Sequence, residues 1–309
     1  MYDAAVPQTS SHPAADDVAP LMPVAPGMPD EPVADDRVAA LSYFFPAHNE
    51  AENIEPLVAE ALAELPRLAR RFEIICVDDG SRDGTAELAD GLAAANPDVV
   101  RVVHHTVNQG YGGALRSGFG AARFSLVCFT DGDRQFRIGD LGRLLERLAL
   151  PAGSGGPATD VVVGFRLKRA DRPIRLAYAR AYRACLRLFF GLRVHDVDCA
   201  CKLFRREALD GIRLESRGAF LSAELLIKLQ ARGRGVAEIG VPHYPRTAGS
   251  ASGADPRVVL RAVRDFWLLR LRLWAGRDAA MRRGMPVLAS VDASVDTGAG
   301  SGSGSAASE

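Results

Sequence analysis

The sequence lacks three features that would point to particular classes of protein. No uninterrupted apolar run reaches the roughly 18 to 20 residues that a membrane-spanning helix needs. Charge is balanced, with 38 Lys and Arg against 38 Asp and Glu, so bulk charge gives no argument for nucleic acid. The N-terminal segment shows no basic flank followed by an apolar core, the pattern of a signal peptide. We therefore predict a cytoplasmic protein without a nucleic-acid partner.

Cysteine is also scarce. The five cysteines lack the C-x-x-C spacing of zinc or thioredoxin-like sites; they are Cys76, Cys128, Cys185, Cys199 and Cys201. Cys199 and Cys201 would share one face of a strand, which leaves vicinal pairing or soft-metal binding as an alternative. The favoured interpretation is reduced thiols that serve as small core residues.

Composition divides the chain into a folded part and two tails. Residues 1–38 are rich in Ala, Pro and Asp, which predicts a disordered acidic tail. Residues 286–309 are rich in Gly, Ser and Ala, which predicts a second disordered tail. Because 48% of the residues are hydrophobic, the chain can bury the core of one large domain or of two small ones. We place a single folded domain at residues 40–255. A helix is predicted over 256–285.

Short β-rich runs alternate with helical patterns in the first half of this domain. Strands are expected at residues 40–47, 72–81, 99–105 and 124–133, and helices at 50–71, 85–97 and 113–123. This alternation predicts a parallel α/β sheet with helices on both faces, and such sheets bind ligands at the carboxyl ends of their strands. Three polar stretches fall at strand ends, at 46–50, 77–81 and 131–133, so one cleft can hold all of them.

The stretch "TDGD" places Asp131 and Asp133 directly after an apolar strand. Two carboxylates joined by a glycine can share one Mg²⁺ or Mn²⁺, which takes few protein oxygens and accepts phosphate oxygens for the rest. The pattern alone is also typical of an ordinary Asp/Gly turn. Its position after a strand, with two polar motifs upstream, favours the metal site.

The stretch "VDDGSRDGT" ends another strand with Asp78 and Asp79. Asp83 and Thr85 are explained as helix caps. Two adjacent carboxylates repel each other unless something donates to them, and uracil or guanine N–H groups and a ribose hydroxyl are such donors. The glycine-rich "NQGYGGALRSGFG" is no dinucleotide fingerprint, because Leu115 stands where G-x-G-x-x-G needs glycine.

The motifs together resemble glycosyltransferase family 2 in order and spacing. They are "FFPAHNEAENI", "VDDGSRDGT", "NQGYGGALRSGF", "TDGDRQF", "VVVGFR", "DVDCACKLFRRE" and "EIGVPHYPRTAGSASG". The resemblance extends over residues 42–255 and is greatest to the branch that makes dolichol- or polyprenyl-phosphate mannose or glucose. It implies a GT-A fold, in which a Rossmann-like mixed α/β sheet flanked by helices binds a nucleotide sugar of the GDP-mannose or UDP-glucose type.

The resemblance also implies roles for residues in the first half of the chain. Three residues would line the nucleotide pocket: Pro46, Ala47 and Glu50. Asp79 would read the base, with Asp78 beside it. Asp131 and Asp133 would hold Mg²⁺ or Mn²⁺, with Gln135 assisting, and the metal would bridge them to the diphosphate of the sugar donor.

In the second half, positive charge is expected to meet phosphate, because guanidinium forks suit phosphate oxygens. Arg166 and Arg180 match family phosphate contacts, and Arg246 matches a mobile arginine loop in which Ser250 supplies a hydroxyl. Asp196 matches the aspartate of a D-x-x-x-G-F-[KR] pattern, from which the chain departs at Ala200 and Cys201. Glu224 would either face the acceptor or belong to a charge network.

The resemblance therefore implies an inverting glycosyltransferase with a polyprenyl phosphate acceptor. A phosphate oxygen is already anionic and needs no base, whereas a soluble hydroxyl acceptor, the first alternative, would need Asp196 or Glu224 as the base. A non-catalytic nucleotide-sugar-binding protein is the second alternative. The helix predicted over 256–285 is basic and amphipathic, which suits an anionic membrane interface at the inner face of the cytoplasmic membrane. Packing on the domain and docking on a membrane protein are its other interpretations.

Overall fold

A computed structural model describes residues 36–150, 158–167, 173–247 and 256–274. The tails predicted at 1–38 and 286–309 therefore lie outside the described residues, apart from 36–38. Ser250 also lies outside them, as does the end of the helix predicted over 256–285.

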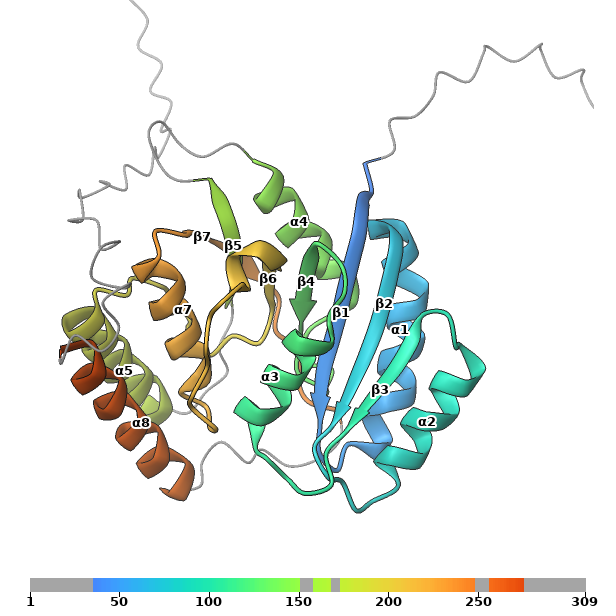
Figure 1. Cartoon of the computed structure of the whole chain (residues 1–309), viewed down its shortest axis with the longest axis horizontal. Coiled ribbons are helices and arrows are strands. Elements are labelled where there is room, and N and C mark those ends of the chain that lie inside the picture. The colour runs from blue at the N-terminus through green and yellow to red at the C-terminus, as the bar shows by residue number, and fades with distance from the viewer. Residues whose placement is uncertain (1–35, 151–157, 168–172, 248–255, 275–309) are drawn as a thin grey trace, which may run out of the picture. The chain divides into compact units, whose positions relative to one another are not determined.

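Within the described residues, seven strands form one sheet in the order β3-β2-β1-β4-β6-β5-β7 (Figure 1). The strands are β1 (Val38–Ala47), β2 (Ala69–Asp78), β3 (Val100–His104), β4 (Leu126–Phe129), β5 (Thr159–Arg166), β6 (Lys202–Arg205) and β7 (Gly235–Val241). The helices are α1 (Ala51–Leu68), α2 (Thr85–Ala95), α3 (Tyr111–Ala121), η1 (Ile138–Asp140), α4 (Leu141–Ala149), α5 (Pro173–Phe190), α6 (Arg206–Leu209), α7 (Leu221–Ala231) and α8 (Pro256–Trp274).

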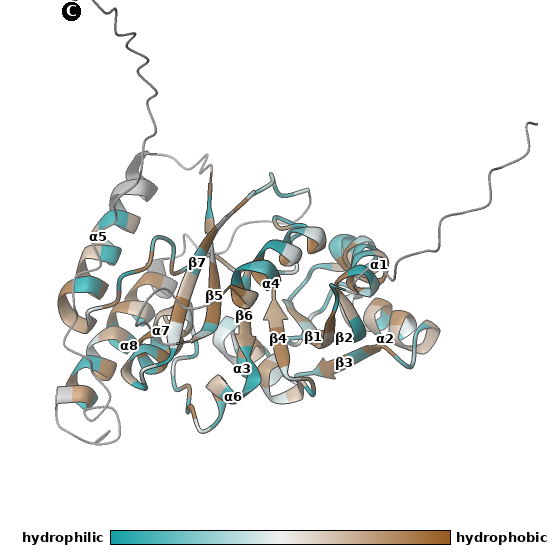
Figure 2. Cartoon of the chain, turned by 90° about the horizontal axis from the view of Figure 1, so that it is seen from above, coloured by the Kyte–Doolittle hydropathy of each residue, from teal (hydrophilic) through white to brown (hydrophobic). Residues whose placement is uncertain are grey.

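Helices cover both faces of the sheet, which is why its strands are apolar on both sides. Viewed from above in Figure 2, α1 and α4 lie on one face and α3 lies on the other, and β4 between them is hydrophobic along its length. In α1 the buried Ile54, Leu57, Val58, Ala61 and Leu65 recur at helical spacing, so they face the sheet.

The helix expected over 50–71 ends three residues early. Ala69 is extended, and it opens β2 by pairing with Val38 of β1. The hydrophobic pattern could not place this boundary, because Arg70 and Arg71 are exposed and polar side chains suit either element. The expectation for these residues was wrong, and the ladder with β1 is the reason.

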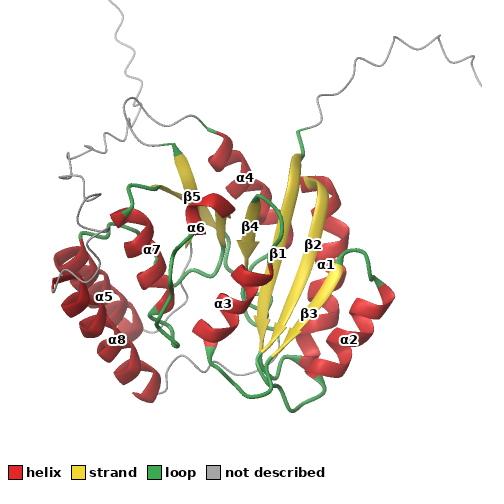
Figure 3. Ribbon diagram, in the orientation of Figure 1, coloured by secondary structure: helices red, strands yellow, loops and turns green. Residues whose placement is uncertain are grey.

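The sheet is mixed, as predicted, because β6 runs antiparallel to both β4 and β5 while the other pairs are parallel. Figure 3 shows the arrows of β1, β2 and β4 pointing the same way. Two antiparallel steps return β5 to the direction of β4, and β7 is parallel to β5. The strands β1, β2, β3, β4, β5 and β7 therefore all end at the same edge, which we call the carboxyl edge. The predicted polar stretches after β1, β2 and β4 meet there.

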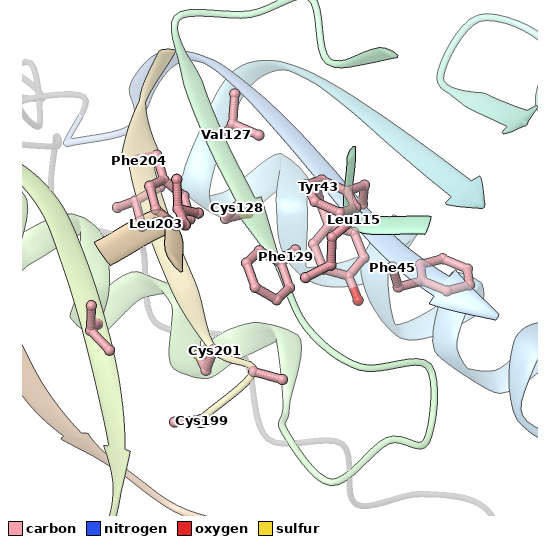
Figure 4. Close-up of a cluster of buried hydrophobic side chains, with 14 of the residues drawn as sticks. Tyr43, Phe45, Leu115, Val127, Cys128, Phe129, Cys199, Cys201, Leu203 and Phe204 are labelled. Atoms are coloured by element: carbon pink, nitrogen blue, oxygen red, sulfur yellow. The ribbon is translucent and has the colours of Figure 1, made fainter. Parts of the chain in front are cut away.

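The core lies where β1, β4 and β6 meet α3, and it includes Phe129, Phe204 and Leu115 (Figure 4). Phe129 stacks on Phe204, with ring centroids 6.3 Å apart. All five cysteines are free thiols, and the four other than Cys185 are buried. Burial raises the pKa of Cys199 to about 11, which keeps its thiol protonated. The favoured interpretation of core thiols is confirmed for these four.

Away from the carboxyl edge, a buried carboxylate links the amino ends of neighbouring strands. Glu73 is fully buried, and its two oxygens accept hydrogen bonds from Ser42 Oγ (2.6 Å), Arg101 Nη2 (2.7 Å) and the Arg123 amide (2.7 Å). Burial alone raises the pKa of Glu73, but these donors outweigh it and lower the pKa. Glu73 thus links β1, β2, β3 and the segment that precedes β4.

Glu73→Gln should lower the free energy of unfolding at pH 7 by about 2 kcal/mol, because hydrogen bonds to a charged group are lost. The folded pKa of Glu73 is depressed, so its stabilisation is present above the unfolded pKa of about 4.3 and is lost as pH falls through the folded value. Urea denaturation at pH 7 and pH 3 should show the difference shrinking in acid. Glu64→Gln, at a partly exposed surface ion pair, is the control and should change stability little. Equal stability of Glu73→Gln and the parent at pH 7 would contradict this role.

Candidate active site

The turn after β4 is pressed against the end of β1. A Cβ on Gly132 would lie 2.7 Å from the carbonyl oxygen of Pro46, a distance that no side chain tolerates. Glycine is therefore required between Asp131 and Asp133, and this contact places both carboxylates beside residues 46–50. Arg134 follows in the left-handed region with φ of 59°, a strained conformation of the kind found at functional sites.

Asp133 joins three distant segments. Its Oδ2 accepts a hydrogen bond from Arg246 Nη2 at 2.6 Å, and its Oδ1 accepts one from the Gln135 amide at 3.1 Å. Arg246 Nη1 also lies 3.6 Å from Glu50 Oε1. Gln135 Nε2 in turn donates to the Tyr244 carbonyl at 3.2 Å, which holds the segment after β7 in place. The structure thus brings together Glu50, Asp133, Gln135 and Arg246.

Asp131 differs from its neighbours because its Oδ1 is buried and accepts no hydrogen bond among the described residues. Burial and the adjacent Asp133 raise the pKa of Asp131 to about 7, against the opposing effects of Tyr111, Lys202 and Arg246. An uncompensated carboxylate oxygen next to a second carboxylate is a good ligand for a hard divalent cation. The donor set therefore fits Mg²⁺ or Mn²⁺.

Two carboxylates are enough for such an ion when a ligand's phosphates complete its coordination. The described residues contain no cluster of three or more His, Cys, Asp or Glu that could hold a metal by itself. The side-chain nitrogen of Gln135 donates to the Tyr244 carbonyl, so the side-chain atom left to bind a metal is Oε1. The role of Gln135 as a metal ligand stays a prediction.

Asp78 ends β2 and Asp79 follows it, and both are almost fully buried, each 3% exposed. Asp78 Oδ1 accepts the Ser81 amide at 3.1 Å, and its Oδ2 lies 3.1 Å from His104 Nδ1. Burial raises the pKa of Asp78, but these partners outweigh it and lower the pKa. Asp79 has its own set of donors from the loop before α3. Pro46 and Ala47, the other predicted pocket residues, end β1 beside them, and Ala47 pairs with Asp78.

At the other side of the carboxyl edge, Arg166 ends β5 and forms a two-pronged ion pair with Asp196, at 2.6 and 2.9 Å. The pair lines a cavity of about 230 Å³ with Phe165, Ala179, Arg180, Arg183 and His195. Three guanidinium groups and one carboxylate therefore surround this cavity. The structure brings together the predicted Arg166, Arg180 and Asp196.

Glu224 is enclosed by protein rather than turned to a ligand. It is 1% exposed, and its oxygens accept the backbone amides of Glu215 (2.9 Å) and Ser216 (2.8 Å) and the Lys228 ammonium (2.6 Å). Of the two roles predicted for Glu224, these contacts favour the charge network.

Two further residues at this edge were not selected from the sequence. Tyr111 is the first residue of α3, and its hydroxyl lies beside Asp131. Lys202 is fully buried, with its Nζ 3.0 Å from the Val197 carbonyl oxygen and 5.6 Å from the Phe129 ring centroid. Burial lowers the pKa of Lys202. The signal for Lys202 was present, because it occupies the basic position that ends the D-x-x-x-G-F-[KR] pattern.

The fold and this edge define an α/β protein of the GT-A type. The mannosyltransferase PcManGT from Pyrobaculum calidifontis, solved with GDP-Man and Mn²⁺, superposes with a TM-score of 0.51 at 20% identity over 71% of this chain and 60% of that one. Mannosyl-3-phosphoglycerate synthase from Rubrobacter xylanophilus superposes with a TM-score of 0.55 at 19% identity, over 77% of this chain and 75% of that one. Residues 42–213 match the family Glycosyl transferase family 2, and the chain belongs to this family.

Two relatives align in sequence with about three quarters of this chain. Glycosyltransferase AglD of Haloferax volcanii is 36% identical over 244 residues, which are 75% of this chain and 38% of that protein. Polyprenol monophosphomannose synthase of Mycolicibacterium smegmatis is 32% identical over 241 residues, 74% of this chain and 86% of that protein. The match thus spans little over a third of the first relative and most of the second.

Asp131→Asn should stabilise the metal-free protein at pH 8 by about 2 kcal/mol or more. Because the folded pKa of about 7 lies above the unfolded value, the parent loses stability as pH rises from about 4 to about 7, and asparagine removes this loss. Urea denaturation in EDTA at pH 4 and pH 8 would measure it, with no gain expected at pH 4. Asp98→Asn, at an exposed position, is the control. If Asp131→Asn is less stable than the parent at pH 8, the Asp131 carboxylate is not an uncompensated charge in the folded protein.

Proposed function

We propose that the protein is an inverting glycosyltransferase that moves a hexose from a nucleoside-diphosphate sugar to a polyprenyl phosphate. Membership of Glycosyl transferase family 2 supports the transferase activity. The donor would be of the GDP-mannose or UDP-glucose type. Relatives named for polyprenyl and undecaprenyl phosphate chemistry support the acceptor class.

The observation that carries the acceptor assignment is the ion pair between Arg166 and Asp196. A hydroxyl acceptor needs a carboxylate base, and the sequence offered Asp196 and Glu224. Both oxygens of Asp196 accept hydrogen bonds from Arg166, and Glu224 is enclosed by backbone amides and Lys228. A phosphate acceptor needs no base, since its oxygen is already anionic, so these contacts favour it over a soluble hydroxyl.

The cavity beside Arg166 suits the acceptor phosphate. Arg166, Arg180 and Arg183 all line it, and guanidinium forks bind phosphate oxygens through paired hydrogen bonds. The carboxylate of Asp196 holds the Arg166 guanidinium in a fixed orientation, because both N–H bonds of the pair are made at once. A phosphate in this cavity would lie at the same edge of the sheet as Asp131 and Asp133.

On the donor side, Asp131 and Asp133 would hold Mg²⁺ or Mn²⁺, and Arg246 would contact the diphosphate. A bound divalent ion would neutralise the charge that develops on the leaving nucleoside diphosphate. Arg246, which pairs with Asp133 in this structure, would move to the diphosphate and add a positive charge that stabilises the same leaving group. Direct attack by the acceptor oxygen, positioned by the arginines, would invert the anomeric carbon.

An apolar face on α5 and α8 would bring the protein to the lipid. Phe189 packs on Trp267 with centroids 5.3 Å apart, and Phe190 packs on Phe266 at 4.9 Å, so the two helices lie side by side. Eight of the exposed large apolar side chains lie on them: Tyr178, Leu188, Val259, Leu260, Val263, Trp267, Leu268 and Leu271. Arginines on both helices complete a surface suited to an anionic interface. In the described part of the chain, no helix is long and apolar enough to cross a bilayer.

Asp133→Ala should abolish sugar transfer while leaving the protein folded, because it removes a proposed metal ligand and the partner of Arg246. The assay is radiolabel transfer from UDP- and GDP-sugars, with Mg²⁺ or Mn²⁺, into organic-extractable polyprenyl phosphate, with circular dichroism as the check on folding. Asp98→Ala is the control and should retain activity. Near-normal transfer by Asp133→Ala would remove the metal-site assignment. Donor hydrolysis without labelled lipid in the parent protein would move the acceptor to a hydroxyl.

Replacing Leu188 and Leu260 by Asp should weaken binding to phosphatidylglycerol vesicles tenfold or more, because each buried leucine is worth about 1.5–3 kcal/mol. Vesicle flotation would measure the bound fraction. Leu150→Asp, at another exposed leucine, directly after α4 and outside α5 and α8, is the control and should bind like the parent. No lipid-dependent flotation of the parent, or equal flotation of all three proteins, would count against the membrane face.

A further inference from the structure

His105 follows β3 and lies buried between two polar partners. Its Nδ1 is 2.6 Å from Asp79 Oδ1, and its Nε2 is 2.8 Å from Ser117 Oγ on α3. The His105 and Asp79 side chains are 5% and 4% exposed. A carboxylate only accepts hydrogen bonds, so Nδ1 carries the hydrogen and donates it to Asp79.

Asp79 has two more donors from the loop before α3. The Gln109 amide donates to Oδ1 at 2.8 Å, and the Gly110 amide donates to Oδ2 at 2.9 Å. Each carboxylate oxygen has about two acceptor positions. Oδ1 is therefore filled by His105 and Gln109, whereas Oδ2 keeps one position beyond Gly110.

The surrounding backbone leaves this carboxylate little freedom to turn. The Asp79 amide donates to the Ala47 carbonyl at 2.8 Å, and the His105 amide donates to the Asp78 carbonyl at 2.9 Å. Gly80 has φ of 69°, and a Cβ there would lie 2.9 Å from the Asn108 amide nitrogen. The loops after β2 and β3 are thus in direct backbone contact.

We propose that His105 is a positioning residue that makes Asp79 selective for uracil over guanine, so that the donor is a UDP-sugar. The proposal rests on the function proposed above, together with the base-reading role that the family resemblance implies for Asp79. The pairing edge of uracil offers a single N–H between two carbonyls, which one acceptor position on Oδ2 satisfies. Guanine presents two adjacent donors, N1–H and the amino group, and pairs best with both oxygens of a carboxylate. With Oδ1 filled, guanine would leave one donor unpaired, and unpaired polar groups are strongly rejected.

Two substitutions separate this role from packing. Asparagine places its amide near the position of Nδ1, so His105→Asn keeps a donor to Asp79. Glutamine reaches toward the position of Nε2, so His105→Gln keeps the contact with Ser117 and loses the donor to Asp79. Glutamine fills more of the imidazole volume, so a role in packing alone predicts that His105→Gln is the milder change.

The experiment is calorimetric titration of UDP and of GDP, each with Mg²⁺, into the parent and both variants. The parent should bind UDP at least tenfold more tightly than GDP. His105→Asn should keep this ratio within about threefold, and His105→Gln should reduce it about tenfold, by weakening UDP and freeing Oδ1 for guanine. If His105→Gln does not fold, Ser117→Ala, which removes only the outer anchor, should lower the ratio in the same direction by a smaller factor.

The transfer assay distinguishes the two proposals. Transfer from a GDP-sugar in preference to a UDP-sugar would leave the proposed function standing and overturn the role of His105. Equal UDP/GDP ratios in the parent and His105→Gln would overturn it as well. No transfer and no nucleotide binding by the parent would overturn the proposed function and this inference together.

Discussion

The carboxyl edge of the sheet concentrates negative charge where water barely reaches. Parallel strands must end at the same edge, so Asp78, Asp79, Asp131 and Asp133 are forced close together. A buried carboxylate needs hydrogen-bond donors or a cation. Asp78 and Asp79 have hydrogen-bond partners in His104, His105 and backbone amides. Asp133 accepts a hydrogen bond from Arg246. Of these four carboxylates at the carboxyl edge, Asp131 is the one with a buried oxygen, Oδ1, that accepts no hydrogen bond among the described residues. The arrangement of loops and arginines around this edge follows from that requirement.

The same physical rule stabilises the fold and prepares the site. At the amino ends of the strands, Glu73 is satisfied entirely by Ser42, Arg101 and Arg123, so it contributes stability. At the carboxyl edge, burial and Asp133 leave Asp131 with a raised pKa, so the folded chain holds a destabilised group there. Such a cost is typical of sites that await a ligand. One end of the sheet therefore contributes stability, and the other is the end at which we propose that a cation and a diphosphate bind.

Much of the fold could be predicted from local sequence patterns. The contacts between residues far apart in the sequence could not. The alternation of strands and helices, and the position of "DGD" after a strand, predicted the sheet and the edge at which the site lies. The ion pair of Arg246 with Asp133 joins residues 113 positions apart, and no periodicity specifies such a contact. His105 gave no metal-ligand spacing, so its contact with Asp79 emerged only from the fold. The early end of α1 at Leu68 was missed because pairing between β1 and β2 fixes it.

The central claim is that Asp131 and Asp133 form a cation site completed by the diphosphate of a donor. Its most direct test is anomalous X-ray scattering from crystals grown with Mn²⁺ and a nucleoside diphosphate. We expect a manganese peak within coordination distance of Asp131 Oδ1 and of the Asp133 carboxylate, with Arg246 beside the diphosphate. Bound nucleotide with no peak between the two carboxylates, and Arg246 still paired with Asp133, would contradict it.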